Sequence, residues 1–201
     1  MMPTFLTAVL TRSDARALRL GERAGAVALV TALTAAAAQI SIPLPFTPVP
    51  FTFQPMVVLV GAMALGARLG MTSQLIYLAL GIAGLPVFAA SPVLPQGLAR
   101  LFGPTGGYLM AYPFAAYLVG ALAERGFDRR YLSSVAAMIA GLAIVFAFGV
   151  LWLGLFMPSA RGLSAALAAG FYPFVLEDLV KLLVAAAVMP RLWAVTGSGA
   201  R

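Results

Sequence analysis

The sequence predicts an all-α integral membrane protein, and three observations support that prediction. Of the 201 residues, 62% are hydrophobic and only 9% are charged, and the mean hydropathy is +1.00. A soluble domain carries roughly a quarter charged residues. The apolar residues form long runs, and short gaps rich in Pro, Gly or Arg separate them. Because a spanning helix needs about 20 apolar residues, the chain has room for about six spans and for no separate soluble domain.

The apolar runs predict a bundle of six transmembrane helices. Their approximate ranges are 24–41, 55–67, 70–88, 105–122, 131–156 and 163–193. Between the first two lies PLPFTPVPFTFQP, residues 43–55, whose five prolines in thirteen residues exclude a continuous helix. Pro173 is expected to mark a bend in the last helix or its true start. We therefore divide the chain into a cytoplasmic lead (1–23), a membrane domain (24–193) and a cytoplasmic tail (194–201).

The distribution of arginine predicts the orientation of the bundle. Six spans place both termini on one side, and the lead, the short turns and the tail on that side hold ten arginines. The other side holds two, Arg100 and Arg161. Positive charge concentrates in cytoplasmic loops, so both termini are expected in the cytoplasm of a multi-pass protein of the bacterial inner membrane. The longer Pro- and Gly-rich loops then face outward, and a ligand site is expected toward that outer face.

Several chemistries are disfavoured by composition. The absence of Cys and His removes disulfides, thiolate chemistry, the usual transition-metal ligands and the base of a serine triad. The GxxxxGK[ST] motif of nucleotide-binding loops is also absent. The net charge of +7 reflects membrane orientation rather than binding to nucleic acid. We therefore expect no metal, no cofactor and no enzymatic activity.

The segment EDLVK, residues 177–181, places the only lysine and two carboxylates inside the last apolar run. On a helix, Lys181 is a neighbour of both Asp178 and Glu177. Each ionised group in hydrocarbon costs about 2.5–3.5 kcal/mol, so the three are expected to face a polar interior. An acceptor beside a donor suits a ligand group that does both, such as a ureido or an amide. The alternative is an ion pair that only packs the helix.

Two outer loops offer further candidates. Arg100 precedes GPTGG and can hold a carboxylate through two parallel hydrogen bonds, or it can reach lipid headgroups as an interfacial arginine. GPTGG itself permits a tight entry into the next helix, whose first N–H groups can face a ligand. Phe46, Phe51 and Phe53 lie on the stiff proline-rich segment and can cover an apolar ligand. The alternative is an aromatic belt at the membrane interface.

A ladder of small residues runs along the first expected helix. It consists of Ala24, Ala28, Ala32 and Ala36. Such spacing lets a second helix approach closely. The ladder either packs inside the chain's own bundle or docks on a separate membrane subunit.

These segments together resemble the BioY family, the biotin-binding S component of energy-coupling-factor (ECF) transporters. The resemblance rests on PLPFTPVPFTFQP, GLPVF (84–88), GPTGGYL (103–109) and EDLVK, and it extends over nearly the whole chain. It implies a six-helix bundle that captures biotin near the outer face. It also implies a transmembrane coupling subunit, docked on the alanine ladder, and partner ATPase subunits that hydrolyse ATP.

The resemblance implies roles for individual residues. Asp178 and Lys181 match the positions that bind the ureido ring, and Arg100 is the candidate partner of the biotin carboxylate. The predicted site also includes Phe51, Phe53, Gln54 and Tyr108, all from the segments that carry the resemblance.

We therefore expect a substrate-capture subunit for biotin uptake. One alternative is the same transporter class with another small vitamin, and a second is a self-sufficient ion-coupled carrier. A third is an intramembrane enzyme that uses Glu177 and Asp178. Adjacent helical residues diverge by about 100°, so these two carboxylates are not expected to share a face.

Overall fold

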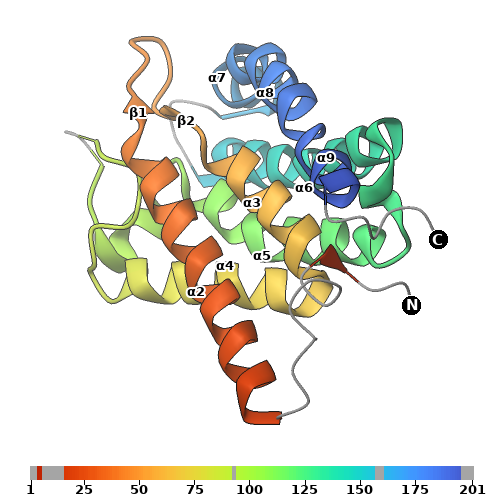
Figure 1. Ribbon diagram of the computed structural model, residues 1–201. Helices are drawn as coiled ribbons and strands as arrows, with labels where there is room; N and C mark the ends of the chain where they lie inside the picture. Colours follow the sequence, from red (N-terminus) through yellow and green to blue (C-terminus); the bar gives the residue numbers. More distant parts are fainter. Residues whose placement is uncertain (1–3, 6–15, 92–93, 157–160, 196–201) are drawn as a thin grey trace.

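The computed structural model describes residues 4–5, 16–91, 94–156 and 161–195, and most of the predicted lead and tail lies outside these ranges. The described chain is mostly helical (Figure 1). The α-helices are α2 (Arg16–Gln39), α3 (Gln54–Leu65), α4 (Ala67–Ile82), α5 (Gly106–Ala123), α6 (Tyr131–Phe156), α7 (Leu163–Gly170), α8 (Tyr172–Ala185) and α9 (Val188–Val195). Two short 3-10 helices, η1 (Gly97–Phe102) and η2 (Phe127–Arg129), and two short strands, β1 (Ser41–Ile42) and β2 (Phe51–Thr52), complete the description.

The helical membrane class predicted from the sequence is confirmed. Three helical segments of the described chain are long and apolar enough to cross a membrane: Leu20–Gln39, Gly106–Ala123 and Tyr131–Leu155. The bounds of α6 coincide with the predicted ones. Most other bounds differ from the predicted ones by up to three residues, and two differ by more. Helix α2 begins at Arg16, because residues 16–23 are mostly good helix formers. Helix α4 ends at Ile82 rather than near residue 88, because Gly84 takes a positive φ of 94° and Pro86 follows.

The proline-rich segment between α2 and α3 is not helical, as predicted. Its two ends pair as antiparallel strands, with Ser41 opposite Thr52 and Ile42 opposite Phe51. This β1–β2 hairpin projects beyond the ends of the helices (Figure 1). The hydroxyl of Thr47 donates a 2.6 Å hydrogen bond to the carbonyl of Ala169, which fastens the hairpin to the end of α7.

The last apolar run is divided into α7, α8 and α9. The first break falls at Phe171, and Pro173 occupies the first turn of α8, where its missing N–H costs nothing. Pro173 therefore marks the start of a helix, one of the two outcomes predicted for it. Helix α9 is fixed at its far end by Trp193, whose indole N–H donates a 2.7 Å hydrogen bond to the carboxylate of Asp128 in η2.

Helix α5 is the centre of the core and packs against α3, α4 and α6 (Figure 1). Its Gly120 lies against the sharp turn between α3 and α4, where Gly66 has a φ of 84°. A Cβ atom on Gly120 would come within 2.4 Å of the backbone nitrogen of Ala67. The tight turn and the close helix contact therefore both require glycine.

The described loops gather at two ends of the bundle. At one end, Arg23 of α2, Arg68 of α4 and Arg125 after α5 line a common hollow. Helix α9 packs against η2 at this end as well. At the other end, Gln39 donates to the carbonyl of Pro86 and Trp152 to that of Gly103, which joins the ends of α2 and α6 to the loops around η1. The candidate site lies toward this second end.

Candidate functional site

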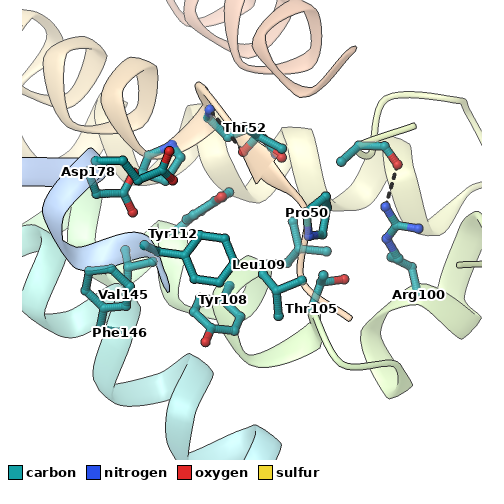
Figure 2. A pocket seen from close by; sticks show the side chains of 16 residues that line it. Pro50, Thr52, Arg100, Thr105, Tyr108, Leu109, Tyr112, Val145, Phe146 and Asp178 are labelled. Atoms are coloured by element: carbon teal, nitrogen blue, oxygen red, sulfur yellow. Dashed lines mark hydrogen bonds between the residues drawn. The ribbon is translucent and has the colours of Figure 1, made fainter. Parts of the chain in front are cut away.

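A pocket of about 60 Å³ lies beneath the hairpin, among α3, α5, α6 and α8 (Figure 2). The hairpin, α3, α5 and α8 form most of its wall. The lining residues are Val49, Pro50, Thr52, Gln54, Pro55, Ala89, Arg100, Thr105, Tyr108, Leu109, Tyr112, Val145, Phe146, Phe174, Glu177 and Asp178. Four of the predicted site residues are in this set: Gln54, Arg100, Tyr108 and Asp178.

Asp178 and Lys181 form the ion pair that their spacing on the helix predicted. The Lys181 Nζ lies 2.7 Å from Asp178 Oδ1 and 3.4 Å from Glu177 Oε1. It also donates a 2.8 Å hydrogen bond to the carbonyl of Thr52 in the hairpin. Both Glu177 and Asp178 border the pocket, whereas Lys181 borders a smaller neighbouring cavity that Asp178 also lines. Asp178 is thus the link between the ammonium group and the pocket.

The placement of Glu177 corrects an expectation. Neighbouring residues on a helix diverge, and only Asp178 was expected to face the site. In the structure both carboxyl groups border the same pocket and share Lys181. Glu177 lies nearer the rim, with a side chain 23% exposed against 10% for Asp178. The pocket is therefore lined by two adjacent carboxyl groups of α8.

Phe51 and Phe53 contact Lys181 rather than the pocket. The ammonium nitrogen lies 4.1 Å from the ring centroid of Phe51 and 5.4 Å from that of Phe53, within the range of cation–π attraction. Phe46 is 66% exposed at the hairpin. The cover of the pocket consists instead of Val49, Pro50 and Thr52 of the same segment. Phe51 and Phe53 therefore contact the lysine, and Val49, Pro50 and Thr52 face the pocket.

Arg100 reaches the pocket from η1 and is only 1% exposed. Its guanidinium donates hydrogen bonds to the carbonyls of Ala89 and Pro95, and its Nε has no hydrogen-bond partner among the described residues. Among the described residues, no carboxylate forms an ion pair with it. Burial lowers the pKa of Arg100 below its ordinary value, because the charge is removed from water. A ligand carboxylate would supply both the missing acceptor and the missing counter-charge.

Gln54 and Tyr108 are held by hydrogen bonds at the pocket wall. The Gln54 amide donates a 2.7 Å bond to the hydroxyl of Tyr77, which in turn donates to the carbonyl of Val87. The Tyr108 hydroxyl donates a 2.6 Å bond to the carbonyl of Gly170, at the break between α7 and α8. Both side chains are therefore fixed before any ligand arrives.

Sequence reasoning missed several lining residues. Thr105 is buried at the entry to α5, and its hydroxyl has no hydrogen-bond partner among the described residues. The position of Thr105 inside the GPTGG segment is the sequence feature that could have indicated its place in the pocket wall. Tyr112, Phe146 and Phe174 supply the apolar and aromatic wall (Figure 2). Nothing in the sequence distinguishes these three from ordinary core residues of a membrane helix.

The arrangement suits a small amphipathic anion. Acidic side chains lie at one end of the pocket, Arg100 at the other, and apolar side chains between them (Figure 2). The described residues contain no cluster of His, Cys, Asp or Glu that could hold a metal ion. The pocket offers hydrogen bonds and charge in fixed positions, which is what a site that binds without chemical conversion requires.

Fold and site together define a helical membrane protein with a pocket for a small molecule. Comparison with known proteins places it more narrowly. The chain belongs to the BioY family, whose model matches residues 12–198. The predicted family resemblance is thereby confirmed, and the chain falls in a family of transport proteins and not of enzymes.

Individual relatives agree with this assignment. The chain is 42% identical to the biotin transporter BioY of Thermotoga maritima, over 82% of this chain and 91% of that protein. It is 40% identical to a probable biotin transporter BioY of Pyrococcus horikoshii, over 83% of this chain and 93% of that protein. Its fold matches the crystal structure of the S-component for biotin from an ECF-type ABC transporter, with a TM-score of 0.78, 24% identity, and coverage of 90% and 95% of the two chains.

Proposed function

We propose that this chain is the substrate-capture subunit of an ECF-type transporter and that its ligand is biotin. The observation that carries the proposal is the polarity of the pocket, with Asp178 at one end and the unpaired guanidinium of Arg100 at the other. Biotin has a ureido ring, an apolar bicycle with a hydrocarbon chain, and a terminal carboxylate. The family and the names of its relatives favour the same ligand.

In this proposal the ureido ring binds at Asp178, with Lys181 holding the carboxylate in place. The apolar middle of biotin lies against Tyr112 and the hairpin, and its carboxylate reaches Arg100. A pocket of about 60 Å³ is smaller than the roughly 300–1,000 Å³ of most small-molecule sites, so ligand entry requires the hairpin to move outward. The bond from Lys181 to the Thr52 carbonyl then breaks, which frees a donor of Lys181 for the ureido oxygen.

We also propose six membrane-spanning segments, formed by α2 to α6 and by α7–α9 together. Both termini lie in the cytoplasm of a bacterial inner membrane, and the pocket faces outward. Support comes from the ten-to-two distribution of arginine along the sequence and from the gathering of Arg23, Arg68 and Arg125 at the end opposite the pocket.

The partners in this proposal are a transmembrane coupling subunit and ATPase subunits that supply the energy of transport. The side of α2 that carries Ala24, Ala28, Ala32 and Ala36 supports it. All four are exposed, whereas Val27, Val30, Thr31 and Thr34 face the bundle. The ladder is therefore open to a helix of another chain.

Isothermal titration of the purified chain with biotin and desthiobiotin tests the ligand. We expect tight binding of biotin, and weaker binding of desthiobiotin, which keeps the ureido ring and the carboxylate but lacks the sulfur ring. Binding of neither compound, together with binding of another vitamin, would assign the chain to a different substrate of the same transporter class.

Uptake of radiolabelled biotin tests the partners. Cells that express the chain with its ATPase and coupling subunits should accumulate biotin, and cells that express the chain alone should accumulate far less. Equal uptake in the two strains, abolished by a protonophore, would identify a self-sufficient ion-coupled carrier.

A further inference from the structure

A basic hollow of about 910 Å³ lies at the end of the bundle opposite the biotin pocket. Three arginines from three separate parts of the chain border it: Arg23 on α2, Arg68 on α4 and Arg125 just after α5. The remaining lining residues are Thr4, Leu65, Ala67, Leu69, Tyr117, Ala121 and Glu124. The biotin site uses none of these residues.

The charges of the basic hollow are not balanced by the described residues around it. Arg23, Arg68 and Arg125 are exposed, and none of them forms an ion pair with a described carboxylate. Among the described residues, Glu124 is the only acid in the lining. Its carboxylate accepts a 2.9 Å hydrogen bond from the backbone N–H of Ala67, at the start of α4, and so serves that helix terminus. Three guanidinium groups therefore face the hollow against one carboxylate that is already in use.

The other wall of the basic hollow is apolar and continues onto the outer surface of α5. Phe114 and Tyr117 are each 50% exposed, and with Ala121 they follow one another at helical spacings of three and four along one side of α5. In a membrane protein, such a side faces the acyl chains of lipids. The hollow thus stands where a hydrocarbon-facing surface meets a cluster of arginines.

We propose that the basic hollow is a binding site for an anionic phospholipid. Its headgroup phosphate accepts hydrogen bonds from Arg23, Arg68 and Arg125, and its glycerol and first acyl carbons lie along Leu69 and Tyr117. Arginine suits phosphate because its planar fork can make two parallel hydrogen bonds. The combination of a headgroup end and a hydrocarbon-facing wall favours a lipid over an acidic segment of a partner protein, which would not need the apolar side.

Native mass spectrometry of the purified chain tests this proposal. The probes are phosphatidylglycerol and phosphatidylcholine with identical acyl chains. The variant Arg68→Gln/Arg125→Gln removes two charges from the hollow. The variant Arg130→Gln/Arg191→Gln removes two exposed charges from the same end of the bundle, outside the hollow, and serves as the matched control. The melting temperature in detergent, measured in parallel, reports whether each variant is folded.

The wild-type chain should prefer phosphatidylglycerol. Since each basic residue near an anionic headgroup contributes about a fivefold change in affinity, the hollow variant should lose roughly 25-fold of its phosphatidylglycerol binding. The control variant should lose less than about threefold. If the double variant does not fold, the single variant Arg23→Gln replaces it, with an expected loss of about fivefold.

Three results would overturn the proposal. Equal losses in the hollow and control variants would mean that only the general surface charge attracts lipid. The absence of a preference for phosphatidylglycerol in the wild-type chain would remove the site altogether. Displacement of the lipid by inorganic phosphate at equal concentration would mean that a soluble anion, and not a lipid, is the ligand. Since lipid binding and folding are both measured without biotin, none of these results depends on the proposed function.

Discussion

Lys181 shows at the scale of one residue how a charged side chain is accommodated inside an apolar helix. Its ammonium group contacts Asp178, Glu177, the Thr52 carbonyl and the rings of Phe51 and Phe53. Each contact replaces part of the hydration that the charge has lost. The contacts also join α8 to the hairpin. The ammonium group of Lys181 therefore both forms the ion pair with Asp178 and connects the site to the hairpin that covers it.

The two carboxylates next to Lys181 should differ in their effect on biotin binding. Asp178 is the more buried, and its oxygen is the nearer to Lys181, at 2.7 Å against 3.4 Å for Glu177. A hydrogen bond to a charged group is worth about 1.5–3 kcal/mol, so Asp178→Asn should weaken biotin binding roughly 10- to 100-fold. Glu177→Gln should weaken it less than about threefold, as exposed pairs contribute little. Equal, small effects in titration calorimetry would show that the cluster is structural.

Arg100 has two tasks that biotin and biotinamide can separate. It donates to the carbonyls of Ala89 and Pro95, which shapes the loop, and we propose that it also binds the ligand carboxylate. Arg100→Ala should weaken binding of biotin by about tenfold or more, because a charge-assisted contact is lost. Biotinamide has no carboxylate and should be affected much less. If both ligands weaken by the same factor, the arginine only supports the loop.

Asp128 should make the stability of the fold depend on pH. It is 1% exposed, and burial raises the pKa of its carboxyl, although the hydrogen bond from Trp193 acts in the opposite direction. A raised pKa in the folded state favours the protonated form, so this contribution to stability is complete below the ordinary value of about 3.9. It is lost as the pH rises through the raised pKa.

Asp128→Asn should therefore match the wild-type chain near pH 4 and become relatively more stable as the pH rises. Asparagine keeps an oxygen that can accept from the Trp193 indole. Melting temperatures of both proteins in detergent, measured from pH 4 upward, check the prediction. A constant difference between the two proteins at every pH would contradict it.

Helix α2 illustrates what can be predicted at the scale of an element. The spacing of its alanines is visible in the sequence, but both an internal and an external role fit that spacing. The structure shows Val27, Val30 and Thr34 buried, with the ladder on the opposite side. Four polar side chains, Thr31, Thr34, Ser73 and Gln74, are buried between α2 and α4. Hydrogen bonds from Thr31 to the Ser73 carbonyl and from Gln74 to the Thr34 hydroxyl fix the rotation of α2.

Bulky residues on the ladder should separate binding from transport. Ala28→Trp or Ala32→Trp should leave biotin affinity within about twofold, because both side chains are exposed and far from the pocket. Uptake in cells with the partner subunits should fall to near background, because close helix contact in lipid needs small residues. Ala136→Trp, on the exposed side of α6, is the matched control. Lost affinity with retained co-purification of the partner would contradict the docking role.

Local rules predicted some elements well and left others open. Apolar length fixed the bounds of α6, proline density excluded a helix between residues 43 and 55, and Pro173 marked the start of α8. The ion pair of Asp178 and Lys181 also follows from helical spacing alone. The contacts of Phe51 with Lys181, and the burial of Thr105 and Arg100, depend on how distant loops fold over the bundle. The pattern of residues within a single segment does not predict such contacts between distant loops and the bundle.

At the scale of the whole molecule, the two ends of the bundle have different chemistry. One end holds the hairpin and the loop around η1, while the other holds the short turns and α9 (Figure 1). The pocket lies at the first end and the basic hollow at the second. The proposed function requires this asymmetry, because in it the ligand arrives at one side of the membrane and partner subunits apply the energy of ATP at the other. The orientation of the bundle is therefore as much a part of the function as the pocket.

Single cysteines offer a direct measurement of that orientation, because the natural chain contains none. Phe46, at 66% exposure in the hairpin, and Val195, at 86% exposure at the end of α9, lie at opposite ends of the bundle. A membrane-impermeant maleimide should label Phe46→Cys in intact cells and should label Val195→Cys only after the membrane is permeabilised. The reason is the excess of arginine at the α9 end, which favours the cytoplasm. The wild-type chain, without a thiol, is the control for background. Labelling of both variants in intact cells would place both residues outside the cell and would contradict the six-span arrangement. Labelling of Val195→Cys but not of Phe46→Cys in intact cells would place the proposed biotin pocket on the cytoplasmic side and exclude uptake from outside.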